Sequence, residues 1–155
     1  LGAFWLIEGF PSLYYLPLYD RIESMKQTMQ VGNTATISFK VEPHMQPVFE
    51  EKIIHRVCST WDLAHQFELA SRHALVPHLE EGEEGIGSGV SIDHCSPAHL
   101  GSDVEVTATV TKTGETEVVC SIEARVGTRL VATGEQIQRV FPVETIERII
   151  ANANN

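Results

Sequence analysis

The stretch Thr60–Leu75, TWDLAHQFELASRHAL, decides the fold, because its apolar residues recur with the period of about 3.6 residues of an α-helix. Ser59 and Asp62 resemble the capping pair that starts such a helix, and Pro77 ends it. One half of the predicted helix is apolar and carries Ala70, Leu63, Ala74, Phe67, Ala64, Leu75 and Trp61. The other half is expected to face water and carries Arg72, His65, Asp62, His73 and Gln66.

Apolar and polar residues alternate on both sides of this helix, which is typical of half-buried β-strands. Strands are predicted over residues 35–41, 86–94, 104–112, 117–126 and 129–141. Gly114 and Gly127 mark the turns between the last three strands. A long helix followed by an antiparallel meander is an α+β pattern, in which the helix covers the apolar face of the sheet.

The two ends of the chain are predicted to lie outside this unit, which spans residues 31–141. Residues 1–30 are interpreted as an arm, and residues 142–155 as a short helix that ends in asparagines. The arm has no basic start and is interrupted by Glu8 and two prolines, so no secretory signal is predicted. It carries aromatic side chains that we expect to pack on the domain or on a neighbouring subunit: Phe4, Trp5, Phe10, Tyr14, Tyr15 and Tyr19.

The length and charge of the chain exclude several classes of protein. Its 155 residues are enough for one domain with its own core. With 11 Lys and Arg against 21 Asp and Glu, the net charge is −10, which argues against a nucleic-acid partner. No segment reaches the ~20 apolar residues of a membrane span. Cys58, Cys95 and Cys120 are widely spaced among apolar neighbours, which predicts buried free thiols in a cytoplasmic protein.

Three polar residues fall within the apolar half of the predicted helix: Thr60, Ser71 and Glu68. Thr60 and Ser71 are small enough to bond to backbone carbonyls of their own helix. Glu68 cannot do so, and a carboxylate facing a sheet costs several kcal/mol unless it is paired or hydrogen bonded. Glu68 is therefore expected to be either a buried functional carboxylate or a side chain that reaches water from the edge of the apolar face.

His94 is the second polar residue in an apolar pattern, because it shares strand parity with Val90 and Ile92. Alone, such a histidine is typical of a core residue. Together with Glu68 and a hydroxyl, it makes an acid–base set in which imidazole is the base and the carboxylate orients it or shares in the chemistry.

Metal and phosphate sites are not predicted. The spacing of His94, Cys95 and His99 matches no zinc signature. The glycines near residue 87 follow a helix and precede a strand, which is the reverse of a phosphate-binding loop. A strand bulge or a close backbone approach to a ligand is the better interpretation of Gly87 and Gly89.

Residues 57–102 resemble the hotdog-fold thioesterases that are similar to fluoroacetyl-CoA thioesterase. That family has a threonine at the start of the hotdog helix and a glutamate eight residues later. A P-x-L-E-x-G segment follows the helix, and a glycine-containing strand then leads to a histidine and a P-x-G-like turn. The matching positions here are Thr60, Glu68, Pro77–Gly82, Gly87, His94 and Leu100–Gly101.

The resemblance implies a hotdog fold in a homodimer and hydrolysis of a small or medium acyl-CoA to free acid and CoA. Thr60, Glu68 and His94 would form the catalytic set in a cleft between two protomers. Gly87 and Ser88 would bind the substrate, with backbone N–H groups at the developing oxyanion. No metal and no cofactor beyond the CoA of the substrate is implied. Candidates for the CoA phosphates are Arg56, Arg72, Lys112, Arg125, Arg129 and Arg139.

One departure from the family pattern leaves alternatives open. The last strand of the family often has a Gly-x-His-x-Arg-like motif, whereas this chain has GEQIQRVF from Gly134, so that histidine and arginine are not carried over. A hotdog module that binds acyl-CoA without hydrolysing it is therefore the alternative. A hydratase or dehydratase is disfavoured, because the chain has no Asp-x-Asn-x-x-His-like loop. Specificity for a fluorinated acyl group is not implied.

Overall fold

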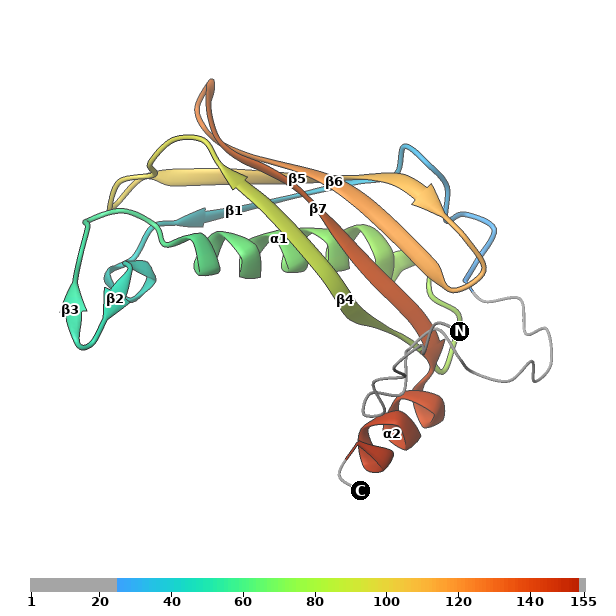
Figure 1. Ribbon diagram of the computed structural model, residues 1–155. Coiled ribbons are helices and arrows are strands. Elements are labelled where there is room, and N and C mark those ends of the chain that lie inside the picture. Colours follow the sequence, from blue (N-terminus) through green and yellow to red (C-terminus); the bar gives the residue numbers. More distant parts are fainter. Residues whose placement is uncertain (1–24, 154–155) are drawn as a thin grey trace, which may run out of the picture.

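The structure is a computed structural model that describes residues 25–153, and its main body is one helix lying along one face of a sheet (Figure 1). The first part of the chain forms β1 (Thr34–Lys40), the short 3₁₀ helix η1 (Pro43–Met45), β2 (Val48–Phe49) and β3 (Lys52–Ile53). Next come the long helix α1 (Thr60–Leu75) and the 3₁₀ helix η2 (Val76–His78). The remainder forms β4 (Glu83–His94), β5 (Asp103–Thr113), β6 (Glu117–Val126), β7 (Arg129–Pro142) and α2 (Val143–Asn152).

The sheet has the strand order β1-β5-β6-β7-β4, and every neighbouring pair is antiparallel. β1 and β4 are therefore its two edges. The inward residues of β5, which are Val104, Val106, Ala108 and Val110, are fully buried. They share the core with the apolar face of α1, including Leu63 and Phe67. The predicted α+β architecture is confirmed, and the predicted bounds of the helix are those observed.

Ser59 caps α1 as predicted, because its hydroxyl accepts a hydrogen bond from the Asp62 backbone N–H at 3.1 Å. Two side chains of this helix differ from expectation. Gln66 was expected to face water but is only 9% exposed. Trp61 was expected in the core but is 48% exposed, and in the first turn of the helix its ring meets Phe49 of the β2–β3 hairpin edge to face at 5.5 Å. The burial of a side chain of α1 thus depends on the neighbouring hairpin and on the edges of the sheet as well as on the helical period.

The three cysteines are free, but the expectation that all are buried is wrong for Cys95. Cys95 follows the last residue of β4, where the chain leaves the sheet, and it is exposed. Cys58 and Cys120 are buried as predicted, and burial raises the pKa of the Cys58 thiol to about 12.

Most of the predicted N-terminal arm, including its aromatic side chains, lies outside the described residues. Its last part packs on the domain: Met25 and Met29 belong to the core, and the Lys26 N–H donates to the carbonyl of His78 at 2.8 Å. The predicted C-terminal helix is observed as α2. Within residues 25–153, no helix combines the length and the apolar content needed to cross a membrane.

Candidate active site

Two of the predicted catalytic residues meet at one end of the sheet. Thr60 is the first residue of α1, and His94 is the last residue of β4. Thr60 Oγ1 lies 3.1 Å from His94 Nδ1, which is a hydrogen bond between a hydroxyl and an imidazole. Thr60 is exposed and His94 is half-buried. This arrangement suits proton transfer, because the hydroxyl and the ring nitrogen are within hydrogen-bond reach. The other ring nitrogen, Nε2, is buried without a hydrogen-bond partner among the described residues.

The third residue, Glu68, lies over Gly87 of β4. A Cβ atom placed on Gly87 would be 2.2 Å from Glu68 Oε1, so the carboxylate occupies the space that a side chain at position 87 would fill. Of the two expectations for Glu68, the single chain shows the second, a side chain that reaches water, because Glu68 is exposed. The physical reason is topological: β4 is an edge strand, so water reaches the carboxylate from beyond the sheet.

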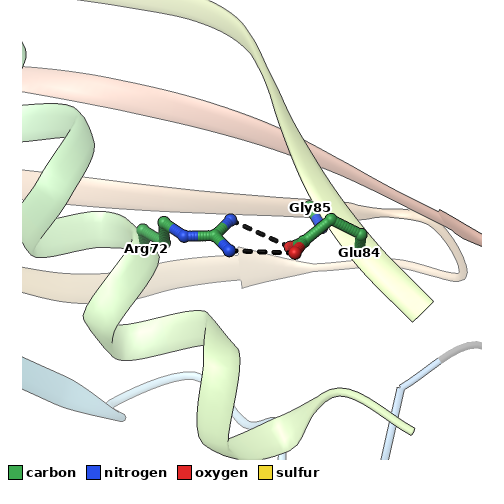
Figure 2. A network of polar contacts seen from close by, with 3 residues as sticks. All are labelled: Arg72, Glu84 and Gly85. Atoms are coloured by element: carbon green, nitrogen blue, oxygen red, sulfur yellow. Dashed lines mark hydrogen bonds and ion pairs between the residues drawn. The ribbon is translucent and has the colours of Figure 1, made fainter. Parts of the chain in front are cut away.

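A salt bridge fastens α1 to β4 one helical turn after Glu68 (Figure 2). Both terminal nitrogens of Arg72 donate to the two carboxylate oxygens of Glu84 at 2.9 Å, and the Gly85 N–H donates to Glu84 Oε1 at 2.7 Å. The Arg72 hydrogen bonds hold the pKa of Glu84 below its usual range. A two-point contact of this kind fixes direction as well as distance. It therefore helps to hold the strand that carries Gly87 at a constant position under the helix.

The predicted bulge in β4 is confirmed. Gly87 pairs with Gln138 and Gly89 with Ile137, so Ser88 is the extra residue. Ser88 is exposed, and its hydroxyl donates to the carbonyl of Ile137 at 3.3 Å. A bulge of this kind bends the strand locally and leaves the extra residue unpaired in the ladder. The assignment of Gly87 and Ser88 to substrate binding stays a prediction.

The structure separates Glu68 from the Thr60–His94 pair within one protomer. Glu68 lies eight residues beyond Thr60, which is roughly 12 Å along the helix axis. Gly87, against which the Glu68 carboxylate lies, is seven residues from His94, roughly 20 Å along the strand. Hydrogen-bond reach is about 3 Å, so Glu68 and His94 of the same chain do not form an acid–base pair. The Thr60–His94 pair lies at the end of β4, whereas the Glu68 carboxylate lies at Gly87 nearer its start.

Sequence reasoning missed two buried amides on the inner face of β7. Gln136 is 2% exposed and Gln138 is 3% exposed. Both share strand parity with the buried Val140, so their polarity on an apolar face was a signal in the sequence. Gln136 Nε2 lies 3.4 Å from the position of a Cβ on Gly87, which brings this side chain to Glu68.

Most of the cations that were candidates for the CoA phosphates are already engaged. Arg72, Lys112, Arg125 and Arg139 each form an ion pair with a glutamate, and Arg129 donates to Ser96 Oγ and to the Pro97 carbonyl. Arg56 is exposed, and its guanidinium has no hydrogen bond or ion pair to any described residue. It lies four residues before Thr60, and its carbonyl accepts from the Leu100 N–H at 3.1 Å. No group of three or more potential metal ligands exists within residues 25–153.

Comparison with known proteins supports the resemblance seen in the sequence. The model of the fluoroacetyl-CoA-specific thioesterase family matches residues 41–144. The fluoroacetyl-CoA thioesterase of Streptantibioticus cattleyicolor is 27% identical over 128 residues, covering 77% of this chain and 91% of that protein.

Solved structures of thioesterases also resemble this chain. A thioesterase superfamily member from Thermus thermophilus has a TM-score of 0.79 and 33% identity, over 83% of this chain and 95% of that one. A variant of the fluoroacetyl-CoA-specific thioesterase, solved in complex with fluoroacetate and CoA, has a TM-score of 0.69 and 26% identity, over 76% of this chain and 99% of that one. The family model covers more than half of the chain, and the solved relatives share its hotdog fold. The chain belongs to the fluoroacetyl-CoA-specific thioesterase family.

Proposed function

We propose that this protein hydrolyses the thioester of a small or medium acyl-CoA to the free acid and CoA. Membership of the family makes it a thioester hydrolase, and one relative was solved with CoA bound. The observation that carries the proposal is the Thr60 Oγ1 to His94 Nδ1 contact of 3.1 Å, because it joins a hydroxyl to a base at the family's positions. The reaction needs water as its second substrate and is proposed to use no metal and no cofactor.

In this proposal His94 is the general base. For Nδ1 to accept the Thr60 proton, the neutral ring carries its own proton on Nε2. The hydroxyl, or a water held beside it, then attacks the thioester carbonyl, the carbon–sulfur bond breaks, and the ring returns the proton to the departing CoA sulfur. Attack by water gives the free acid directly, whereas an acyl-Thr60 ester is hydrolysed in a second step by a water that His94 activates, which frees the Thr60 hydroxyl. Glu68 is the orienting carboxylate or the nucleophile, and backbone N–H groups at the Gly87 bulge stabilise the oxyanion. Mass spectrometry of acid-quenched enzyme separates an acyl-Thr60, an acyl-Glu68 and direct attack by water.

A homodimer joined through β4 would complete the site. β4 is an edge strand, and Val90 and Ser91, which follow its bulge, are exposed. If two copies pair antiparallel about a two-fold axis at Ser91, and Ser88 is the extra residue of the bulge, Gly87 lies opposite the partner subunit's His94. The Glu68 carboxylate of one protomer then faces the hydroxyl–imidazole pair of the other. This pairing accounts for the distance between Glu68 and His94 within one chain.

Mixed dimers test both the activity and this assembly. Glu68→Ala and His94→Ala are each expected to abolish turnover of an acyl-CoA panel, measured by release of the CoA thiol. Random mixing of the two inactive variants yields about half mixed dimers, each with one intact site of two, so about a quarter of wild-type activity returns. Failure of the mixture to regain activity would refute the shared site. Wild-type protein that releases no thiol from any acyl-CoA would refute the enzyme.

The alternative is a hotdog module that binds acyl-CoA without hydrolysing it. In the motif that begins at Gly134, the histidine and the arginine of the family pattern are replaced by Gln136 and Gln138. The loss of these two residues favours the alternative. A non-hydrolysing module would show a rise in melting temperature with acyl-CoA and no free acid. Appearance of free acid in the same sample would exclude it. In either case we propose a cytoplasmic protein, because free thiols such as the exposed Cys95 persist in reducing compartments.

A further inference from the structure

The side chain of Gln136 is a buried polar group next to the candidate site, and it needs a reason to be there. It lies on β7 between Cys120 of β6 and Val90 of β4, and it is 2% exposed. Its acceptor oxygen, Oε1, is buried and has no hydrogen-bond partner within the described part of the chain. An amide in such a place costs free energy unless its other end makes a favourable interaction.

The other end of this amide is turned toward Glu68. The position of a Cβ on Gly87 is 2.2 Å from Glu68 Oε1 and 3.4 Å from Gln136 Nε2, so Oε1 and Nε2 lie at most about 5.6 Å apart on either side of that position. Nε2 carries two N–H donors, and an ionised carboxylate only accepts. The reverse orientation would set the amide oxygen beside a negative oxygen, which is repulsive. The missing Cβ of Gly87 is what lets both groups approach.

Gln138, two residues along β7, is a natural reference. It is buried to the same degree, at 3% exposed, and faces the same side of the strand. Its Oε1 lies 2.7 Å from the Cβ position of Gly85, where its neighbour is the apolar side chain of Leu75. Thus two buried amides occupy equivalent positions, and the Gly87 contacts place one of them at a carboxylate of the candidate site.

We propose that Gln136 is a positioning residue for the reaction: its side-chain N–H groups hold the Glu68 carboxylate against Gly87. The inference rests on the proposed function, because it assigns Gln136 a role through Glu68. An amide keeps its donors at every pH, whereas the histidine of the family pattern changes its charge near neutral pH. Gln136 therefore supplies a donor whose strength does not depend on its own protonation.

The test compares Gln136→Met with Gln138→Met, in which an unbranched apolar side chain of similar length replaces each amide. Gln136→Met is expected to lower kcat by about tenfold or more, the loss of one hydrogen bond to a charged group, with KM changed less than about twofold. Gln138→Met is expected to keep kcat within about twofold of wild type. Gln136→His, which retains an N–H donor, is expected to keep more kcat than Gln136→Met. Equal losses in the two Met variants, or a Gln136→Met enzyme with unchanged kcat, would overturn the proposal.

Crystal structures of the two Met variants give a readout that does not depend on activity. The Glu68 carboxylate is expected to leave the face of Gly87 in Gln136→Met and to stay in Gln138→Met. If the carboxylate stays in both variants, Gln136 does not position it. Should wild-type protein hydrolyse no acyl-CoA, the proposed function fails, and the position of the carboxylate in these structures alone decides the role of Gln136.

Discussion

The substitution Gly87→Ala tests directly whether the position of the Glu68 carboxylate matters for turnover. The new Cβ would lie 2.2 Å from Glu68 Oε1 and 3.1 Å from its carboxyl carbon. Non-bonded carbon and oxygen atoms normally stay more than about 3 Å apart, so the carboxylate has to retreat by about 1 Å. Displacement of a catalytic group by about 1 Å costs roughly 10²-fold in rate. We therefore expect kcat of Gly87→Ala to fall about 100-fold on whichever acyl-CoA the wild type hydrolyses best.

The folded state should tolerate the same substitution. The φ angle of Gly87 is not in the left-handed region, so alanine fits the backbone. The displaced atoms are the end of a flexible, exposed side chain, and alanine in a strand is favoured over glycine by about 0.5–1 kcal/mol. Thermal unfolding should consequently show a melting temperature equal to wild type or slightly higher. A loss of activity with no loss of stability is the signature of a displaced carboxylate.

Gly89→Ala is the matched control, because it adds a Cβ to the same bulge. That atom would meet the Ile137 side chain at 3.4 Å, an ordinary contact, and it approaches no carboxylate. Its kcat is expected to stay within about threefold of wild type, since the group that moves is apolar. If Gly87→Ala keeps wild-type kcat, or if Gly89→Ala loses as much, the assigned position of Glu68 has no part in the reaction.

Three further predictions concern charges and thiols away from Gly87. Arg56→Ala should raise KM for acyl-CoA several-fold at low salt and leave KM for an acyl-pantetheine, which lacks the nucleotide phosphates, unchanged. Arg125→Ala removes a cation that is already ion-paired and should change neither of these KM values. Glu84→Gln should cost about 0.5 kcal/mol of stability above pH 4.5. The difference between variant and wild type should vanish as the pH falls through the lowered pKa of Glu84, because Arg72 stabilises only the ionised carboxyl. A difference in stability that persists at pH 2 would contradict the pairing. Cys58, with its pKa raised to about 12 by burial, should resist iodoacetamide at pH 8 in native protein and react after unfolding, as peptide mapping by mass spectrometry would show.

Local pattern was enough to predict the long helix and the five strands of the main sheet, although not the short hairpin of β2 and β3. The helix Thr60–Leu75 and the strand Glu117–Val126 have the bounds expected from their periodicity, because one face of each must be apolar to cover the core. The cap at Ser59 and the bulge at Gly87–Gly89 were likewise predictable, since each depends on residues that are neighbours in the chain. Glu68 and His94 were singled out as polar side chains that break these patterns, and the family resemblance added Thr60 to the candidate set.

Which polar groups meet was decided only by the tertiary structure, because strand order and register determine it. Periodicity placed Glu68 and His94 on apolar faces, but it contained no information that β4 is an edge strand and leaves Glu68 exposed. It also gave no sign that Thr60, thirty-four residues away, reaches His94, or that the side chains of Gln136 and Glu68 both lie beside Gly87. A helix period describes one element at a time, whereas a site made by a helix, an edge strand and its neighbour depends on how those elements pack.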